Sequence, residues 1–144
     1  MKQILFLLCL AISSNAFAHG EDKYGPNMGY IRMPGTFHTE LVSQKDGSFL
    51  VYLLDLQNKN PSIKDSSVEL ELRNGDDKRT ANCSAINDHF LCKGIEGKIT
   101  RGEITVKAKR LGIQAKEAVY KLPLTLKKAE KSNSSMEGHD MKNM

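Results

Sequence analysis

Several short segments of this chain alternate apolar and charged residues, and this pattern constrains the fold more than any other feature. Residues 68–73 read V-E-L-E-L-R, and residues 104–109 read I-T-V-K-A-K. A period of two is typical of a β-strand that buries one face and exposes the other to water. No comparable segment has the 3.6-residue period of a long amphipathic helix, so we expect an all-β protein.

Other segments extend this interpretation to a whole domain. Residues 49–54 form a continuous apolar run, which predicts a central strand covered on both sides. Residues 120–122 alternate again, and Pro123 is expected to end that strand or place it at an edge. Turn-forming pairs at 46–47, 74–75, 87–88 and 101–102 separate the strands. The spacing predicts an immunoglobulin-like antiparallel β-sandwich of about seven strands.

The first residues, 1–18, have the three parts of a secretory signal peptide. Lys2 provides the positive charge, residues 4–12 are apolar but too short to span a bilayer, and residues 16–18 read A-F-A, a cleavage site. We therefore expect cleavage after Ala18, a periplasmic location, and His19 as the first residue of the mature chain. No second long apolar segment follows, so we expect no membrane insertion after cleavage.

The mature chain divides into three parts. Residues 19–35 are rich in Gly, Pro and polar side chains and predict a flexible N-terminal arm; residues 36–126 form the sandwich domain. Residues 127–144 are polar, with too little apolar content to fold alone, and predict a disordered tail. The basic residues are spread along the chain rather than clustered, and aromatic residues are sparse, so we expect no nucleic-acid partner.

Two cysteines, Cys83 and Cys92, remain after signal cleavage. They bracket a hairpin whose natural two-residue loop is Asn87–Asp88, and this pairing puts the two cysteines opposite each other at a non-hydrogen-bonded position. In an oxidising compartment an even pair predicts one disulfide. The alternative is a pair of free thiols that bind metal, but the spacing is not C-x-x-C.

The tail contains a first candidate metal-binding set. Residues 135–144 combine thioethers and an imidazole in a segment with no core to bury them. These are the ligands that soft ions such as Cu(I) and Ag(I) prefer. The alternative is a polar tail in which Met recurs by chance. The candidate ligands are Met136, His139, Met141 and Met144.

The arm and the first strand contain a second candidate set. Alternation in residues 37–41 puts Phe37 and Leu41 inside and leaves His38 and Glu40 on the wet face. The α-amino group and imidazole of His19, with His38, would suit Cu(II), whereas the methionines would favour Cu(I). The alternative is that the methionines pack the arm onto the sandwich while His38 pairs with Glu40. The candidate ligands are His19, Met28, Met33 and His38.

Three short stretches resemble a motif in the periplasmic adaptor subunits of heavy-metal efflux pumps. They are G-P-N-M-G at 25–29, G-T-F-H-T-E-L-V at 35–42 and V-Y-L at 51–53. The family has a G-P-H-G-G-like turn, so Asn27 and Met28 stand where it tends to have His and Gly. The match covers about the first third of the mature chain, and no coiled-coil or barrel segment of an adaptor follows. The resemblance implies a small heavy-metal-associated module with an efflux system as partner.

These observations lead to one favoured function and one alternative. We expect non-catalytic binding of copper, as Cu(I) or Cu(II), or of a related soft metal, for resistance, storage or delivery to efflux. No Gly-rich phosphate loop or G-x-S-x-G motif is present, and a disulfide would leave no free thiol nucleophile. The alternative is an envelope interaction module that binds another protein through an exposed strand edge, with no metal role.

Overall fold

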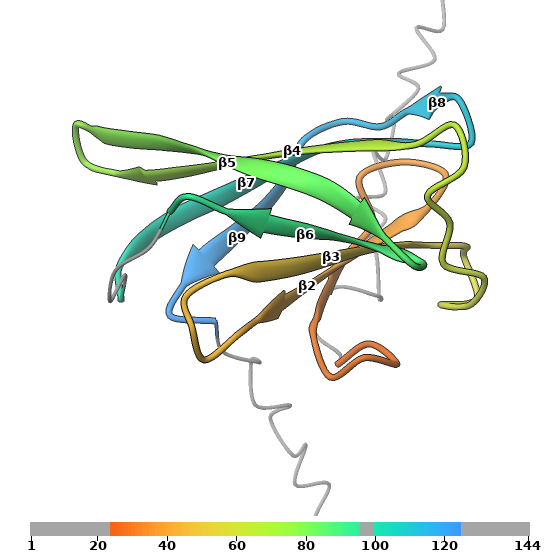
Figure 1. Cartoon of the computed structure of the whole chain (residues 1–144), viewed down its shortest axis with the longest axis horizontal. Helices are drawn as coiled ribbons and strands as arrows, with labels where there is room; N and C mark the ends of the chain where they lie inside the picture. Colours follow the sequence, from red (N-terminus) through yellow and green to blue (C-terminus); the bar gives the residue numbers. More distant parts are fainter. Residues whose placement is uncertain (1–23, 96–99, 125–144) are drawn as a thin grey trace, which may run out of the picture.

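The computed structural model describes residues 24–95 and 100–124, and these residues form strands and turns with no helix. The predicted all-β fold is confirmed, with nine strands rather than about seven (Figure 1). The additional strands are very short, and their segments carry no alternating pattern. The strands are β1 (Tyr30–Arg32), β2 (His38–Ser43), β3 (Phe49–Leu54), β4 (Ser67–Asn74), β5 (Asp77–Ile86), β6 (His89–Lys93), β7 (Gly102–Arg110), β8 (Ile113–Gln114) and β9 (Ala118–Leu122).

All strand pairs are antiparallel, and the strands follow the order β1-β2-β3-β6-β5-β4-β7-β8, with β9 also paired to β7. Strand β5 joins the two halves of this sheet. Its N-terminal part pairs with β4, and its C-terminal part pairs with β6 (Figure 1). The sheet therefore curls around a single core and forms a nearly closed barrel.

The core lies between the two halves of the sheet and is filled by the apolar positions of the alternating segments. Leu70 and Leu72 of β4 face Ile104 and Val106 of β7, and all four are at most 2% exposed. As predicted, the 49–54 run is a central strand, paired with β2 on one side and β6 on the other. The period-two pattern thus located the inward face correctly.

The barrel is closed by side-chain contacts at a seam where β1 and β2 meet β9. Tyr120, fully buried in β9, donates a hydrogen bond of 2.9 Å to the carbonyl of Thr39, and its hydroxyl also lies 2.6 Å from Thr39 Oγ1. The Arg32 Nε donates to the carbonyl of Val119, and the Lys116 N–H donates to the carbonyl of Pro34. Part of the predicted arm, residues 30–32, therefore belongs to the barrel as β1.

The predicted disulfide is present, and it joins β5 to β6 across a tight hairpin. Cys83 lies opposite Cys92, Ile86 lies opposite His89, and the Cα atoms of the two cysteines are 4.0 Å apart. This pairing is the one that the two-residue Asn87–Asp88 loop predicts. Asn87 adopts a φ of 53°, which a tight hairpin turn requires and which Asn tolerates.

Candidate functional site

The outward face of β2 carries His38 and Glu40, as the alternation predicts, but this face is not exposed to water. Phe37 and Leu41 belong to the core, and His38 and Glu40 lie on the other side of the strand. His38 is 6% exposed and Glu40 is fully buried. The expectation of an accessible His38 on a wet face is therefore wrong, because another segment of the chain covers this face.

The covering segment is the turn at 25–29, and the Glu40 carboxylate holds it in place. The backbone N–H groups of Asn27 and Gly29 donate to Glu40 Oε1 at 2.8 and 2.9 Å, and Asn27 Nδ2 donates to Oε2 at 2.9 Å. A Cβ atom at Gly25 would collide with this carboxylate, and one at Gly29 would collide with the β2 backbone. The glycines at both ends of G-P-N-M-G were the available sequence signal for this anchor, which the alternation pattern missed.

This use of Glu40 removes the predicted alternative for His38. Both carboxylate oxygens are engaged by the turn, and among the described residues no ion pair joins Glu40 to His38. The Nδ1 atom of His38 is buried and has no hydrogen-bond partner within residues 24–95 and 100–124. A buried ring nitrogen without a partner is unusual, because most buried polar atoms are hydrogen-bonded.

The two methionines of the arm lie at opposite ends of β1. Met28 is at the apex of the anchored turn, with a φ of 62° and an exposed fraction of 73%. Met33 is 40% exposed and directly follows Arg32, whose cross-strand partner is Thr39. The pairing of β1 with β2 ends at Arg32, and one further step of the same register would place Met33 opposite His38. Neither methionine is buried in the core.

Met33 also lines a hollow at the seam between β1 and β9, with a volume of about 340 Å³. The Arg32 guanidinium crosses this seam, 5.1 Å from the centre of the Tyr120 ring. The hollow offers a route from solvent to the side of the barrel where Met33 lies. It is lined by Arg32, Met33, Pro34, Lys116, Glu117, Ala118 and Val119.

The signal peptide, its cleavage site and five candidate ligands lie outside the described residues: His19, Met136, His139, Met141 and Met144. The described parts of the two chain ends nevertheless meet at one side chain, Tyr30. Its ring centre lies 5.4 Å from that of Tyr24, and its hydroxyl donates a 2.7 Å hydrogen bond to the carbonyl of Leu124. Tyr24 and Leu124, the first and the last described residues, therefore both contact Tyr30 of β1.

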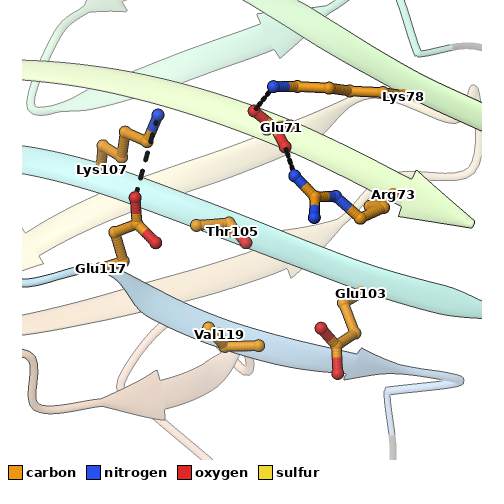
Figure 2. A pocket seen from close by; sticks show the side chains of 8 residues that line it. All are labelled: Glu71, Arg73, Lys78, Glu103, Thr105, Lys107, Glu117 and Val119. Atoms are coloured by element: carbon orange, nitrogen blue, oxygen red, sulfur yellow. Dashed lines mark hydrogen bonds and ion pairs between the residues drawn. The ribbon is translucent and has the colours of Figure 1, made fainter.

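A second hollow, of about 300 Å³, lies on the outer face of β4, β7 and β9 and is lined mainly by charged side chains (Figure 2). Glu71 lies between Lys78 at 3.0 Å and Arg73 at 3.2 Å, and Lys107 lies 3.9 Å from Glu117. The hydrogen bond from Lys78 is the main cause that lowers the pKa of the Glu71 carboxyl.

The charges that line this second hollow are largely paired with one another, which is typical of a solvated sheet face rather than a catalytic site. The alternating charges at 69–73 and 103–107 were its sequence signal. Across residues 24–95 and 100–124, no cluster of three or more His, Cys, Asp or Glu side chains is arranged to hold a metal ion.

Within the same described ranges, no helix is long and apolar enough to cross a membrane. Comparison with known proteins adds no relative: no family model, no curated protein and no solved structure matches the chain.

Proposed function

We propose that this protein binds a soft metal ion, copper as Cu(I) or a chemically similar ion such as Ag(I), in the periplasm and without catalysis. Its role would be resistance, storage or delivery to an efflux system. The proposed primary ligands are the imidazole of His38 and the thioether of Met33. An imidazole and a thioether form the kind of mixed ligand set that suits Cu(I).

The observation that carries this proposal is the buried Nδ1 of His38, which has no hydrogen-bond partner. A buried polar atom without a partner costs free energy, and a bound metal ion would supply the missing partner. Glu40 does not supply it, because its carboxylate is occupied by Asn27 and Gly29. Met33 directly follows the last residue of β1 that is paired with β2, and it lines a hollow of about 340 Å³.

The meeting of both chain ends at Tyr30 supports a contribution from the second ligand set. Tyr24 and Leu124 both contact Tyr30, so the described residues nearest in sequence to His19 and to the tail methionines meet at one side chain. A tethered ligand has a high effective concentration at a nearby site, which increases affinity without new contacts. The Met/His tail would then act as a flexible supplement to the His38 and Met33 pair.

The alternative function, addition of a partner strand at an exposed edge, has less support at the seam. The carbonyl of Val119 on the β9 edge already accepts a hydrogen bond from Arg32, and the carbonyl of Leu124 accepts one from Tyr30. An added strand would have to displace these intramolecular contacts before it could pair. Metal binding requires no such displacement.

The test is a competitive Cu(I) titration of the chain that begins at His19, against a chelator of known affinity. Sub-nanomolar binding, equivalent to about −12 kcal/mol, would support the proposal. We expect His38→Gln and Met33→Leu each to weaken binding by about tenfold or more, since loss of one ligand is worth about 1.4 kcal/mol or more.

His89→Gln is the matched control. His89 is also partly covered, but its Nδ1 lies 3.0 Å from Asp88 Oδ1 and its ring stacks on Tyr52. Cu(I) affinity should therefore stay unchanged in this variant. Truncation after Ser135 measures the tail separately. Unchanged affinity in His38→Gln, or binding no tighter than micromolar in the parent chain, would refute the proposal and favour the interaction module.

A further inference from the structure

The turn that joins β7 to β8 contains Leu111 in a left-handed backbone conformation, which bulky apolar residues rarely adopt. Arg110 pairs with Ile113, so the loop consists of Leu111 and Gly112 alone. Both have positive φ, 49° for Leu111 and 80° for Gly112. A two-residue turn of this kind favours Asn or Gly at its first position, because a bulky side chain is strained in the left-handed region.

The strained leucine does not serve the core. Leu111 is 46% exposed and Ile113 is 55% exposed. Backbone strain that persists at an exposed position and has no packing reward is typical of a functional surface. Nothing in the sequence marks Leu111 as the first residue of a turn, because leucine is not a usual turn former.

The turn is held against the segment at 55–66, and together they form one end of the barrel (Figure 1). The N–H of Gly112 donates to the carbonyl of Asp65 at 2.8 Å, and Arg110 donates to the carbonyls of Leu53 and Asn60. This segment adds a third exposed apolar side chain, Leu56, which is 50% exposed. We call residues 55–66 and 109–116 the basic tip.

The basic tip carries an excess of positive charge. Five basic side chains stand against two carboxylates, Asp55 and Asp65. The Asp55 carboxylate accepts hydrogen bonds from the N–H groups of Lys59 and Gln57, and the bond from Lys59 is the main cause that lowers its pKa. The basic side chains are Lys59, Lys64, Lys109, Arg110 and Lys116.

We propose that the basic tip binds the surface of an anionic lipid bilayer. Leu56, Leu111 and Ile113 would enter the boundary between headgroups and acyl chains, and the surrounding lysines would face lipid phosphates. Exposed apolar side chains combined with basic residues in the same loops are the combination that drives interfacial binding. The excess of positive charge at the basic tip complements an anionic lipid surface, and its exposed apolar side chains suit the apolar region beneath the headgroups. The inference does not depend on metal binding.

The test is co-sedimentation of the chain that begins at His19 with vesicles of phosphatidylglycerol and phosphatidylcholine mixed, or of phosphatidylcholine alone. This start point removes the apolar run at 4–12, which would bind lipid by itself. We expect binding to the anionic vesicles only, weakening as salt increases. Leu111→Asn should weaken it by about fivefold or more, since a partly exposed leucine would lose its burial in lipid.

The same variant separates function from stability. Asn tolerates the left-handed region, so Leu111→Asn should leave the urea unfolding midpoint unchanged or higher. Ile86→Thr is the control: Ile86 is 38% exposed next to another hairpin turn, and its substitution should not alter vesicle binding. Absence of binding to anionic vesicles, equal binding to neutral vesicles, or unchanged binding of Leu111→Asn would overturn the proposal. Each of these results would favour a protein partner, rather than a lipid bilayer, as the ligand of the basic tip.

Discussion

Loss of the Glu40 carboxylate should destabilise the protein far more than loss of a surface carboxylate. Glu40 is fully buried and accepts three hydrogen bonds of 2.8 to 2.9 Å from Asn27 and Gly29. A hydrogen bond to a charged acceptor contributes about 1.5 kcal/mol, and buried donors left without a partner add to the loss. Part of this is offset, because the variant no longer buries a charge. We therefore expect Glu40→Ala to lower the free energy of unfolding by about 3 to 4 kcal/mol.

Glu40→Gln divides this cost into its parts. The amide retains one oxygen for the two backbone N–H groups, but it loses the charge and presents an NH₂ group to Asn27 Nδ2. Rotation of the Asn27 amide can restore an acceptor there, so we expect a smaller cost of about 1 to 2 kcal/mol. The order of stability should be parent, Glu40→Gln and then Glu40→Ala.

The assay is urea unfolding followed by far-UV circular dichroism, with amide hydrogen exchange at Asn27 and Gly29 as a local measure. Glu69→Ala is the matched control, because Glu69 pairs with Lys107 at 3.3 Å on an exposed face, where ion pairs contribute little. If Glu40→Ala costs less than about 1 kcal/mol, or if exchange at Gly29 stays as slow as in the parent, the anchor has been misidentified.

Three further predictions concern stability. Tyr120→Phe should lower the unfolding free energy by about 1 to 2 kcal/mol in urea titrations, since both hydrogen bonds to Thr39 are buried, and a cost near zero would contradict this. Because the pKa of Glu71 is lowered in the folded state, Glu71 contributes to the free energy of unfolding above pH 4.5, and this contribution is lost as the pH falls through the folded-state pKa. Lys78→Met should make the free energy of unfolding less sensitive to acid. If its pH dependence is the same as in the parent, Glu71 is not a source of the acid sensitivity. Reduction of the disulfide, which joins cysteines with a sequence separation of 9, should lower the free energy of unfolding by about 2.5 to 3 kcal/mol. An unfolding midpoint that does not shift when dithiothreitol is added would refute that value.

Most of the barrel could be predicted from the sequence because its strands follow a local rule. Alternate residues of a strand face opposite sides, so the apolar positions of 68–73 and 104–109 identified the core face directly. The 83–92 hairpin was predictable to its register, since a two-residue loop fixes which residues lie opposite each other. Strands β1 and β8 were missed because strands of three and two residues are too short to show a period.

The candidate site was only half predictable for a related reason. Alternation placed His38 and Glu40 on one face, but it contains no information about what packs on that face. Glu40 is fully buried because the turn at 25–29 packs over the outward face of β2, where the N–H groups of Asn27 and Gly29 donate to its carboxylate. Met33 was a candidate from its chemistry, whereas its place at the end of β1, beside the paired residues Arg32 and Thr39, depends on the pairing of β1 with β2.

The sequence by itself thus determined the features that arise from neighbouring residues: the all-β class, the inward faces of the strands, and the disulfide hairpin. Tertiary structure decided which outward faces meet water and which distant segments meet each other. The hydroxyl of Tyr30 donates a hydrogen bond to the carbonyl of Leu124, 94 positions further along the chain, and no local pattern links residues so far apart. The physical reason is that strand periodicity is fixed by the covalent geometry of the backbone, whereas burial of a second face depends on long-range packing.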